Sequence, residues 1–302
     1  MVTVHNFSNG ILNPALAYSV SCLGAFLGLR CVTRARALDG VPRALWLVLA
    51  SVSVGATGIW AMHFIAMLGF TIQGQQITYN VPVAIASMLL AILVVGAGLF
   101  IVGYGSGGWP RLASGGVIIG FGVAGMHYMG MDGMNMPDRV SYNGPLVVLS
   151  ILIAIVAGTA ALWAGTRVRG IGATIGASMI MGIAVCGMHY TGMEAMSFAP
   201  GSMGAMSGST GFSFVVPLVI GLTVVTLAIA LTISVARTED EIAEDEVFRR
   251  RIDEFEASWP GLAINTQSWA KPGSTPTRHR GRLRPIRRNC APPRCNCNCI
   301  HA

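Results

Sequence analysis

The chain has 302 residues, of which 53% are hydrophobic and only 11% are charged, and its formal net charge is +7. Soluble domains usually carry about 25% charged residues, so this composition excludes an ordinary soluble globular protein. The positive charge lies mainly beside apolar segments and in the C-terminal part. It therefore indicates membrane topology and gives no reason to expect a specific nucleic-acid partner.

Seven apolar stretches are long enough to cross a lipid bilayer, which takes roughly 20 residues each. They comprise residues 11–33, 44–70, 81–103, 112–131, 145–166, 171–193 and 212–236. Arginines follow the first, third and fifth stretches, whereas the other connections between stretches carry no net positive charge. Because positively charged loops stay in the cytoplasm, we predict an outer N-terminus and a cytoplasmic C-terminus.

The prediction is an all-α integral membrane protein with four regions. Residues 1–10 form a short external N-terminus, and residues 11–236 form the membrane domain. Residues 237–258 are predicted to form a charged helix next to the membrane. Residues 259–302 are predicted to form a disordered cytoplasmic tail rich in Arg, Pro and Cys. The tail cysteines lack the paired spacing of a zinc site, so we expect no folded metal domain there.

A short motif recurs at the outer ends of three of the apolar stretches. Its histidines are His63, His127 and His189, which stand 64 and 62 residues apart. A regular period of this kind indicates repeated architecture. Each predicted unit holds two spanning helices joined on the inner side, so the domain is three two-helix units plus one helix. Small residues stand two and five positions before each histidine and three after it, which favours close packing of these helices.

Each histidine is preceded by one methionine and followed four residues later by another. The nine residues are Met62, His63, Met67, Met126, His127, Met131, Met188, His189 and Met193. Positions four apart lie on one helical face, so each helix presents an imidazole and a thioether in the same direction. Among transition metals these donors favour copper. Cys186 is a possible additional ligand, and a haem held by two of the histidines is the weaker alternative.

Three further side chains stand beside the motif histidines. Tyr128, Tyr190 and Thr191 are expected to orient the imidazoles through hydrogen bonds. For the tyrosines the alternative is an aromatic anchor at the membrane surface. For the histidines the alternative to metal ligation is a purely structural role, in which each ring bonds to a partner on another helix.

These motifs resemble the MHYT family of bacterial membrane sensor domains. The tetrad MHYT stands intact at residues 188–191, and it appears as MHYM at 126–129 and as MHFI at 62–65. The resemblance covers residues 11–236 and implies seven helices in the bacterial inner membrane with outward-facing motifs. It also implies copper held by the motif residues, and detection of oxygen, carbon monoxide or nitric oxide. Phe64 and Ile65 replace Tyr and Thr in the first copy, so no hydroxyl is expected to orient that histidine.

The leading functional hypothesis is a sensor or regulator embedded in the lipid bilayer. The chain shows no GGDEF or EAL segment, so we expect it to be no enzyme and to pass its signal to a cytoplasmic partner protein. Two alternatives stay open. A metal transporter needs ligands along a path through the membrane, and a redox-active membrane metalloprotein needs a substrate to turn over.

Overall fold

A computed structural model describes residues 4–5, 10–72, 77–105, 108–135, 139–199, 209–235 and 239–258. The chain divides into two units, Met1–Glu244 and Asp245–Ala302, and every spanning helix belongs to the first. The tail at 259–302 and most of the N-terminal 1–10 segment lie outside the described residues, so the predictions for them are untested. The charged segment predicted at 237–258 contains a helix, α9 (Glu239–Ser258).

Seven helices in the described part of the chain are long and apolar enough to cross a membrane. They are α1 (Leu12–Arg36), a second span from Gly40 to Met67, α4 (Val81–Gly103), α5 (Trp109–Asp132), α6 (Gly144–Arg167), α7 (Ile171–Glu194) and α8 (Gly211–Val235). The predicted spans are confirmed, with ends that differ by four residues at most. The first span runs on through Arg34 and Arg36 because cations are favourable in the last turn of a helix.

The outward faces of these helices are apolar. Leu93, Val156, Ile180 and Leu231 leave about two thirds of their surface exposed, at 68%, 67%, 67% and 65%. Contiguous apolar surface of this extent is costly in water and favourable in lipid. Together with the seven spans it makes the chain a multi-pass membrane protein.

The second span changes its backbone pattern part-way along. It consists of α2 (Gly40–Val52), the π-helical stretch η1 (Ser53–Ala61) and α3 (Met62–Met67). A β-carbon on Gly24 of α1 would lie 2.3 Å from the Gly58 nitrogen, so the two backbones approach closely there. The Ser53 hydroxyl donates to the Gly24 carbonyl at 3.0 Å, which adds a polar tie between α1 and η1.

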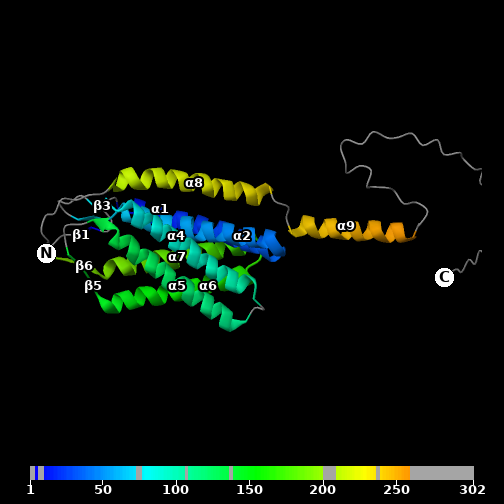
Figure 1. Cartoon of the computed structure of the whole chain (residues 1–302), viewed down its shortest axis with the longest axis horizontal. Helices are drawn as coiled ribbons and strands as arrows, with labels where there is room; N and C mark the ends of the chain where they lie inside the picture. Colours follow the sequence, from blue (N-terminus) through cyan, green and yellow to red (C-terminus); the bar gives the residue numbers. More distant parts are fainter. Residues whose placement is uncertain are drawn as a thin grey trace, which may run out of the picture. The chain divides into compact units, whose positions relative to one another are not determined.

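Six of the spans close into a ring, and the seventh packs outside it. Around the ring α1 packs against η1, η1 against α4, α4 against α5, α5 against α6, α6 against α7, and α7 against α1. The last span, α8, packs against η1 and α1, and Figure 1 shows it running alongside them. The Thr57 and Thr226 hydroxyls share a hydrogen bond of 3.0 Å between η1 and α8. The arrangement is the predicted one of three two-helix units plus one helix. The units are α1 with the second span, α4 with α5, and α6 with α7, and α8 is the additional helix.

Short antiparallel strands connect the outer loops, at the end of the ring near β1, β3, β5 and β6 in Figure 1. The strands are β1 (Val4–His5), β2 (Thr71–Ile72), β3 (Thr78–Tyr79), β4 (Met134–Asn135), β5 (Arg139–Tyr142), β6 (Met196–Ala199) and β7 (Ser209–Thr210). β1 pairs with β2, β3 lies between β4 and β7, and β5 pairs with β6. The predicted helical domain therefore carries an outer layer of paired loops, which we call the strand cap.

Arginines at the opposite end tie the first two spans to three other helices. Each donates to a backbone carbonyl near a helix C-terminus, and the pairs are Arg34 with Ile233 (2.8 Å), Arg36 with Gly165 (3.3 Å), and Arg43 with Gly103. A cation is stabilising at this end of a helix because the last carbonyls have no partner within the helix. The arginines and the motif histidines thus lie at opposite ends of the bundle, in agreement with the predicted orientation.

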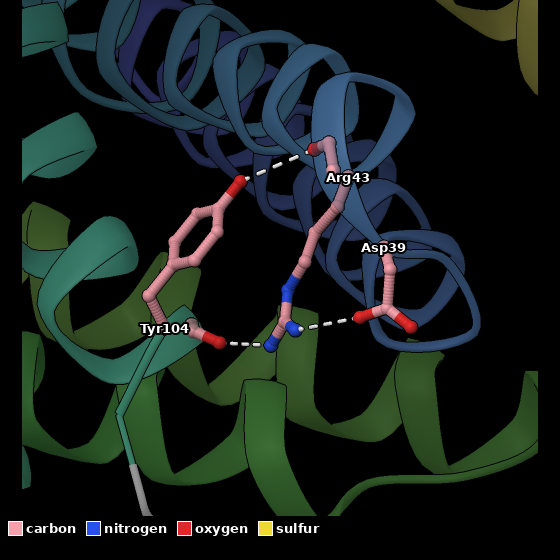
Figure 2. A network of polar contacts seen from close by, with 5 residues as sticks. Asp39, Arg43 and Tyr104 are labelled. Atoms are coloured by element: carbon pink, nitrogen blue, oxygen red, sulfur yellow. Dashed lines mark hydrogen bonds and ion pairs between the residues drawn. The ribbon is translucent and has the colours of Figure 1, made fainter.

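Figure 2 shows the polar contacts around Arg43. Its guanidinium lies 3.5 Å from the Asp39 carboxylate and covers the Tyr104 ring at 4.9 Å from the ring centroid. The Tyr104 hydroxyl in turn donates to the Gly40 carbonyl at 3.4 Å. These contacts join the start of α2 to the end of α4.

Candidate metal centre

The three motif histidines meet in the middle of the helix ring. His63 comes from α3, His127 from α5 and His189 from α7. Their Nδ1 atoms form a triangle with sides of 3.1, 3.2 and 3.3 Å. The rings pack edge to face, with centroids 4.9–5.1 Å apart and planes at 84–87°. All three side chains are fully buried. We call this group the histidine triad.

The repeat explains why the histidines converge. Each one lies four or five residues before the end of its helix, at Met67, Asp132 or Glu194. The three helices alternate with the other helices around the ring, so they occupy equivalent positions. Equal depth and alternate placement bring equivalent side chains onto one central axis.

Glycines shape the space around two of the rings. A β-carbon on Gly130 would lie 2.6 Å from His63 Nε2, and one on Gly192 would lie 2.4 Å from His127 Nε2. Both distances are too short for any real side chain, so only glycine fits against the imidazole of the preceding copy. The small residue predicted three positions after each histidine therefore makes room for a ring. Ala66 holds the corresponding position in the first copy.

An aromatic residue supports each imidazole from its own helix. The residue after each histidine packs edge to face against it, at 4.9 Å for Phe64, 4.9 Å for Tyr128 and 5.0 Å for Tyr190. The Tyr128 hydroxyl shares a 2.7 Å hydrogen bond with Ser150 of α6. The Thr191 hydroxyl donates to Gly187 of its own helix at 2.7 Å. These contacts orient the imidazoles through ring edges, and the predicted hydroxyl roles remain predictions.

The six motif methionines are all buried, at 1–5% exposure. Five of them belong to one core cluster, namely Met67, Met126, Met131, Met188 and Met193. Met62 belongs to a separate cluster with Ala17 and Ile65, against which the half-buried Cys186 packs. The structure thus places thioethers in the core that surrounds the triad. Ligation by these methionines or by Cys186 remains a prediction.

The strand cap closes the outer side of this core. Tyr79 of β3 is buried and packs against Phe64 at a ring distance of 5.9 Å. Burial raises the pKa of the Tyr79 phenol well above its ordinary value. Tyr142 of β5 packs edge to face against Tyr128 at 5.7 Å. Burial, and then the nearby Asp132 carboxylate and Tyr128, raise the pKa of Tyr142. Both phenols therefore stay protonated near neutral pH.

The triad has the donor set of a metal site. The Nδ1 atoms lie within 4.8 Å of one another, and among the described residues no cysteine or carboxylate joins the group. An ion at the centre of the triangle would lie about 1.9 Å from each nitrogen, close to the usual zinc–imidazole bond of about 2.0–2.1 Å.

The hydrogen-bonding capacity of the three rings supports the same interpretation. Within the described part of the chain, Nε2 of His63 and Nε2 of His127 are buried without a hydrogen-bond partner. A buried polar group without a partner costs about 1–3 kcal/mol. In a neutral imidazole each nitrogen either donates or accepts, so three Nδ1 atoms that face one another cannot all be satisfied by hydrogen bonds among themselves. A cation between them would accept all three Nδ1 lone pairs, with the protons on Nε2.

An apolar cavity of about 60 Å³ lies one helical turn inward from the triad. Ile59, Val123 and Val185, each four residues before a motif histidine, line it together with Met188. We call it the inner chamber. The chamber was not predicted from the sequence, although branched apolar residues at these three equivalent positions were a visible signal.

Comparison with known proteins places this architecture in a family. A family profile named MHYT, described as a bacterial signalling protein N-terminal repeat, matches residues 57–115, 120–177 and 182–243. The chain belongs to the MHYT family. Each matched MHYT repeat begins six or seven residues before a motif histidine. The spacing of the matched repeats agrees with the predicted period. The first match begins within the second span, however, so α1 lies outside the matched repeats and α8 lies within the third, whereas the sequence had predicted α8 as the extra helix.

Several signalling proteins are similar to this MHYT chain. MucR of Pseudomonas aeruginosa, a bifunctional diguanylate cyclase and cyclic di-GMP phosphodiesterase, is 36% identical over 227 residues, which are 73% of this chain and 33% of MucR. The phosphodiesterase NbdA of the same species is 34% identical, over 60% of this chain and 24% of NbdA. The signalling protein YkoW of Bacillus subtilis is 28% identical, over 61% and 23%. The chain spans about a third or less of these relatives, and no solved structure matches it significantly.

Proposed function

We propose that this MHYT signalling domain is a membrane sensor that holds one copper ion on the histidine triad and responds to a diatomic gas or to copper itself. The observation that carries the proposal is the convergence of three buried Nδ1 atoms from three separate helices. Copper is favoured over other metals because soft thioethers line the same core. When bound, the ion supplies a coordination position for oxygen, carbon monoxide or nitric oxide.

The residues around the triad support such a site. His63, His127 and His189 provide the nitrogen ligands. Gly130 and Gly192 leave the space that two of the rings occupy. The strand cap and the apolar core exclude bulk water. The inner chamber is large enough for a diatomic molecule, and its apolar walls favour an uncharged ligand.

The geometry argues against haem. Pockets for ligands of that size usually measure about 300–1,000 Å³. The inner chamber is about 60 Å³, and the Nδ1 atoms stand at most 3.3 Å apart. No porphyrin fits between rings this close.

The geometry also argues against a metal transporter. Transport needs ligands along a path, whereas the axis inward from the triad is lined by apolar side chains such as Leu99 and Leu162. Arg36 and Arg43 stand at its inner end, where they repel a cation. A site closed on that side fits sensing better than passage.

The names of the relatives bear on the output of the sensor. MucR and NbdA are named as cyclic di-GMP enzymes, and each is much longer than its similarity to this chain. We propose that the present chain has no catalytic activity and signals through helix movement to a cytoplasmic partner. Such a signal needs two conformations with different ligand affinity.

Metal analysis of the purified full chain tests the proposal. We expect copper in the native protein and loss of most of it in His63→Ala, His127→Ala and His189→Ala, because two imidazoles hold an ion far less tightly than three. His5→Ala, outside the triad, is the matched control and should retain copper. Unchanged copper in all three triad variants, or zinc in place of copper, would remove the copper proposal.

A further inference from the structure

A second cavity opens at the inner end of the ring, with a volume of about 240 Å³. We call it the inner vestibule. Its walls come from α1, α2, α4 and α6, and its key lining residues are Arg36, Arg43, Leu47, Leu99, Gly103 and Leu162. The lining combines two guanidinium groups with a largely apolar surface and includes no acidic residue among the described ones.

The two arginines are held in place by the bundle itself. Arg36 donates to the Gly165 carbonyl at 3.3 Å, and Arg43 donates to the Gly103 carbonyl. Because each guanidinium is anchored to a helix end, little side-chain entropy remains to be lost when a ligand binds. Both guanidinium charges therefore lie at the wall of one cavity, where they can bind an anion.

The positive charge at Arg43 is poorly compensated. Its nearest acid, Asp39, is 3.5 Å away, but the Asp39 side chain is 99% exposed (Figure 2). Ion pairs exposed to this degree contribute little. Nε of Arg43 is buried and has no hydrogen-bond partner in the described part of the chain. An anion in the vestibule would neutralise the Arg43 guanidinium charge.

We infer that the inner vestibule binds a phosphate group, with the headgroup of an anionic phospholipid of the cytoplasmic leaflet as the favoured source. Guanidinium groups bind phosphate oxygens in pairs, with charge-assisted hydrogen bonds. Basic pockets between membrane helices on the cytoplasmic side suit anionic headgroups. The apolar wall formed by Leu47, Leu99 and Leu162 accepts the glycerol and first acyl carbons, which free phosphate lacks.

Lipid titration of the purified full chain tests this inference. Thermal unfolding is measured in detergent with added phosphatidylglycerol, phosphatidylcholine or inorganic phosphate. We expect phosphatidylglycerol to raise the unfolding temperature, and Arg36→Gln to raise the half-saturating lipid concentration about tenfold, as expected for loss of one charged hydrogen bond. Arg169→Gln removes the same charge from an exposed inner connection and serves as the matched control.

The outcomes separate the possibilities. A response to inorganic phosphate alone that Arg36→Gln abolishes supports phosphate binding with a soluble source. Equal responses to phosphatidylglycerol and phosphatidylcholine, or equal losses in Arg36→Gln and Arg169→Gln, overturn the inference. So does a baseline unfolding temperature that falls in Arg36→Gln while the lipid response stays intact, because the arginine then acts only on the fold. Arg36→Lys, which keeps the charge but loses the paired donors, should recover part of the response.

Discussion

Adding one methyl group at the glycine that faces a triad ring should displace that ring without removing any ligand. In Gly192→Ala the new β-carbon would lie 2.4 Å from His127 Nε2, and in Gly130→Ala it would lie 2.6 Å from His63 Nε2. Ordinary contacts begin near 3.4 Å, so each ring must move by about 0.8–1 Å. Both rings are fully buried, and close-packed interiors offer no free space for that movement.

The expected cost follows from overpacking. Extra methylenes in a packed core destabilise by about 1–3 kcal/mol. A shift of this size also opens the Nδ1 triangle, whose longest side is 3.3 Å. Disturbing the orientation of metal-binding histidines typically costs 10–100-fold in affinity. We therefore expect both variants to fold with lower stability and to bind metal at least tenfold more weakly.

Two other glycines on the same helices provide matched controls. A β-carbon on Gly187 would meet nothing within 4 Å, and one on Gly125 would meet only Leu90, at an ordinary 3.6 Å. Because alanine favours a helix over glycine by about 1 kcal/mol, Gly187→Ala and Gly125→Ala should be neutral or slightly stabilising. Thermal unfolding and competition with a copper chelator measure both effects. Native metal affinity and native stability in both triad-facing variants would refute the reasoning.

Two further substitutions test the packing around the triad. Trp60→Phe removes the indole N–H that donates to the Ala84 carbonyl and the Ser87 hydroxyl, each at 3.0 Å, and leaves a void in the core. It should lower the free energy of unfolding by about 1–3 kcal/mol in thermal or denaturant titration, and an unchanged value would mean that the site relaxes around the smaller ring. Thr226→Val removes the 3.0 Å hydroxyl contact with Thr57. It should cost about 0.5–1.5 kcal/mol while metal content stays native, since α8 lies outside the ring; loss of metal would show that α8 supports the site.

Much of the architecture was predictable because membranes impose strong rules on sequence. The length of each apolar stretch predicts a span, and arginine placement predicts orientation. The equal spacing of His63, His127 and His189 predicted that equivalent side chains share one depth. Their convergence followed from that period together with the small residues near each histidine, which favour close helix packing.

Other features depend on contacts that no local pattern specifies. The strand cap is built from strands of two to four residues, too short to show an alternating pattern. The inner chamber and the inner vestibule depend on how side chains from several helices fill the axis. The role of Gly130 and Gly192 was predicted as helix packing, but their neighbour is an imidazole from another repeat. The methionine spacing predicted that each imidazole shares a helical face with a thioether, whereas ligation depends on where the sulfur atoms lie.

The π-helical stretch η1 has a physical reason in one of the positions at which the repeats differ. Ala66 stands where the other copies have Gly130 and Gly192, and those positions tolerate no β-carbon against a ring. In a site of strict threefold symmetry, the methyl group of Ala66 would collide with the third imidazole. The triangle is nevertheless nearly equilateral, so α3 must sit slightly off the symmetric position. A π-helical stretch changes the rise and rotation of a helix, and η1 lies directly before α3. We infer that η1 makes the offset that lets an alanine-bearing copy complete the triad.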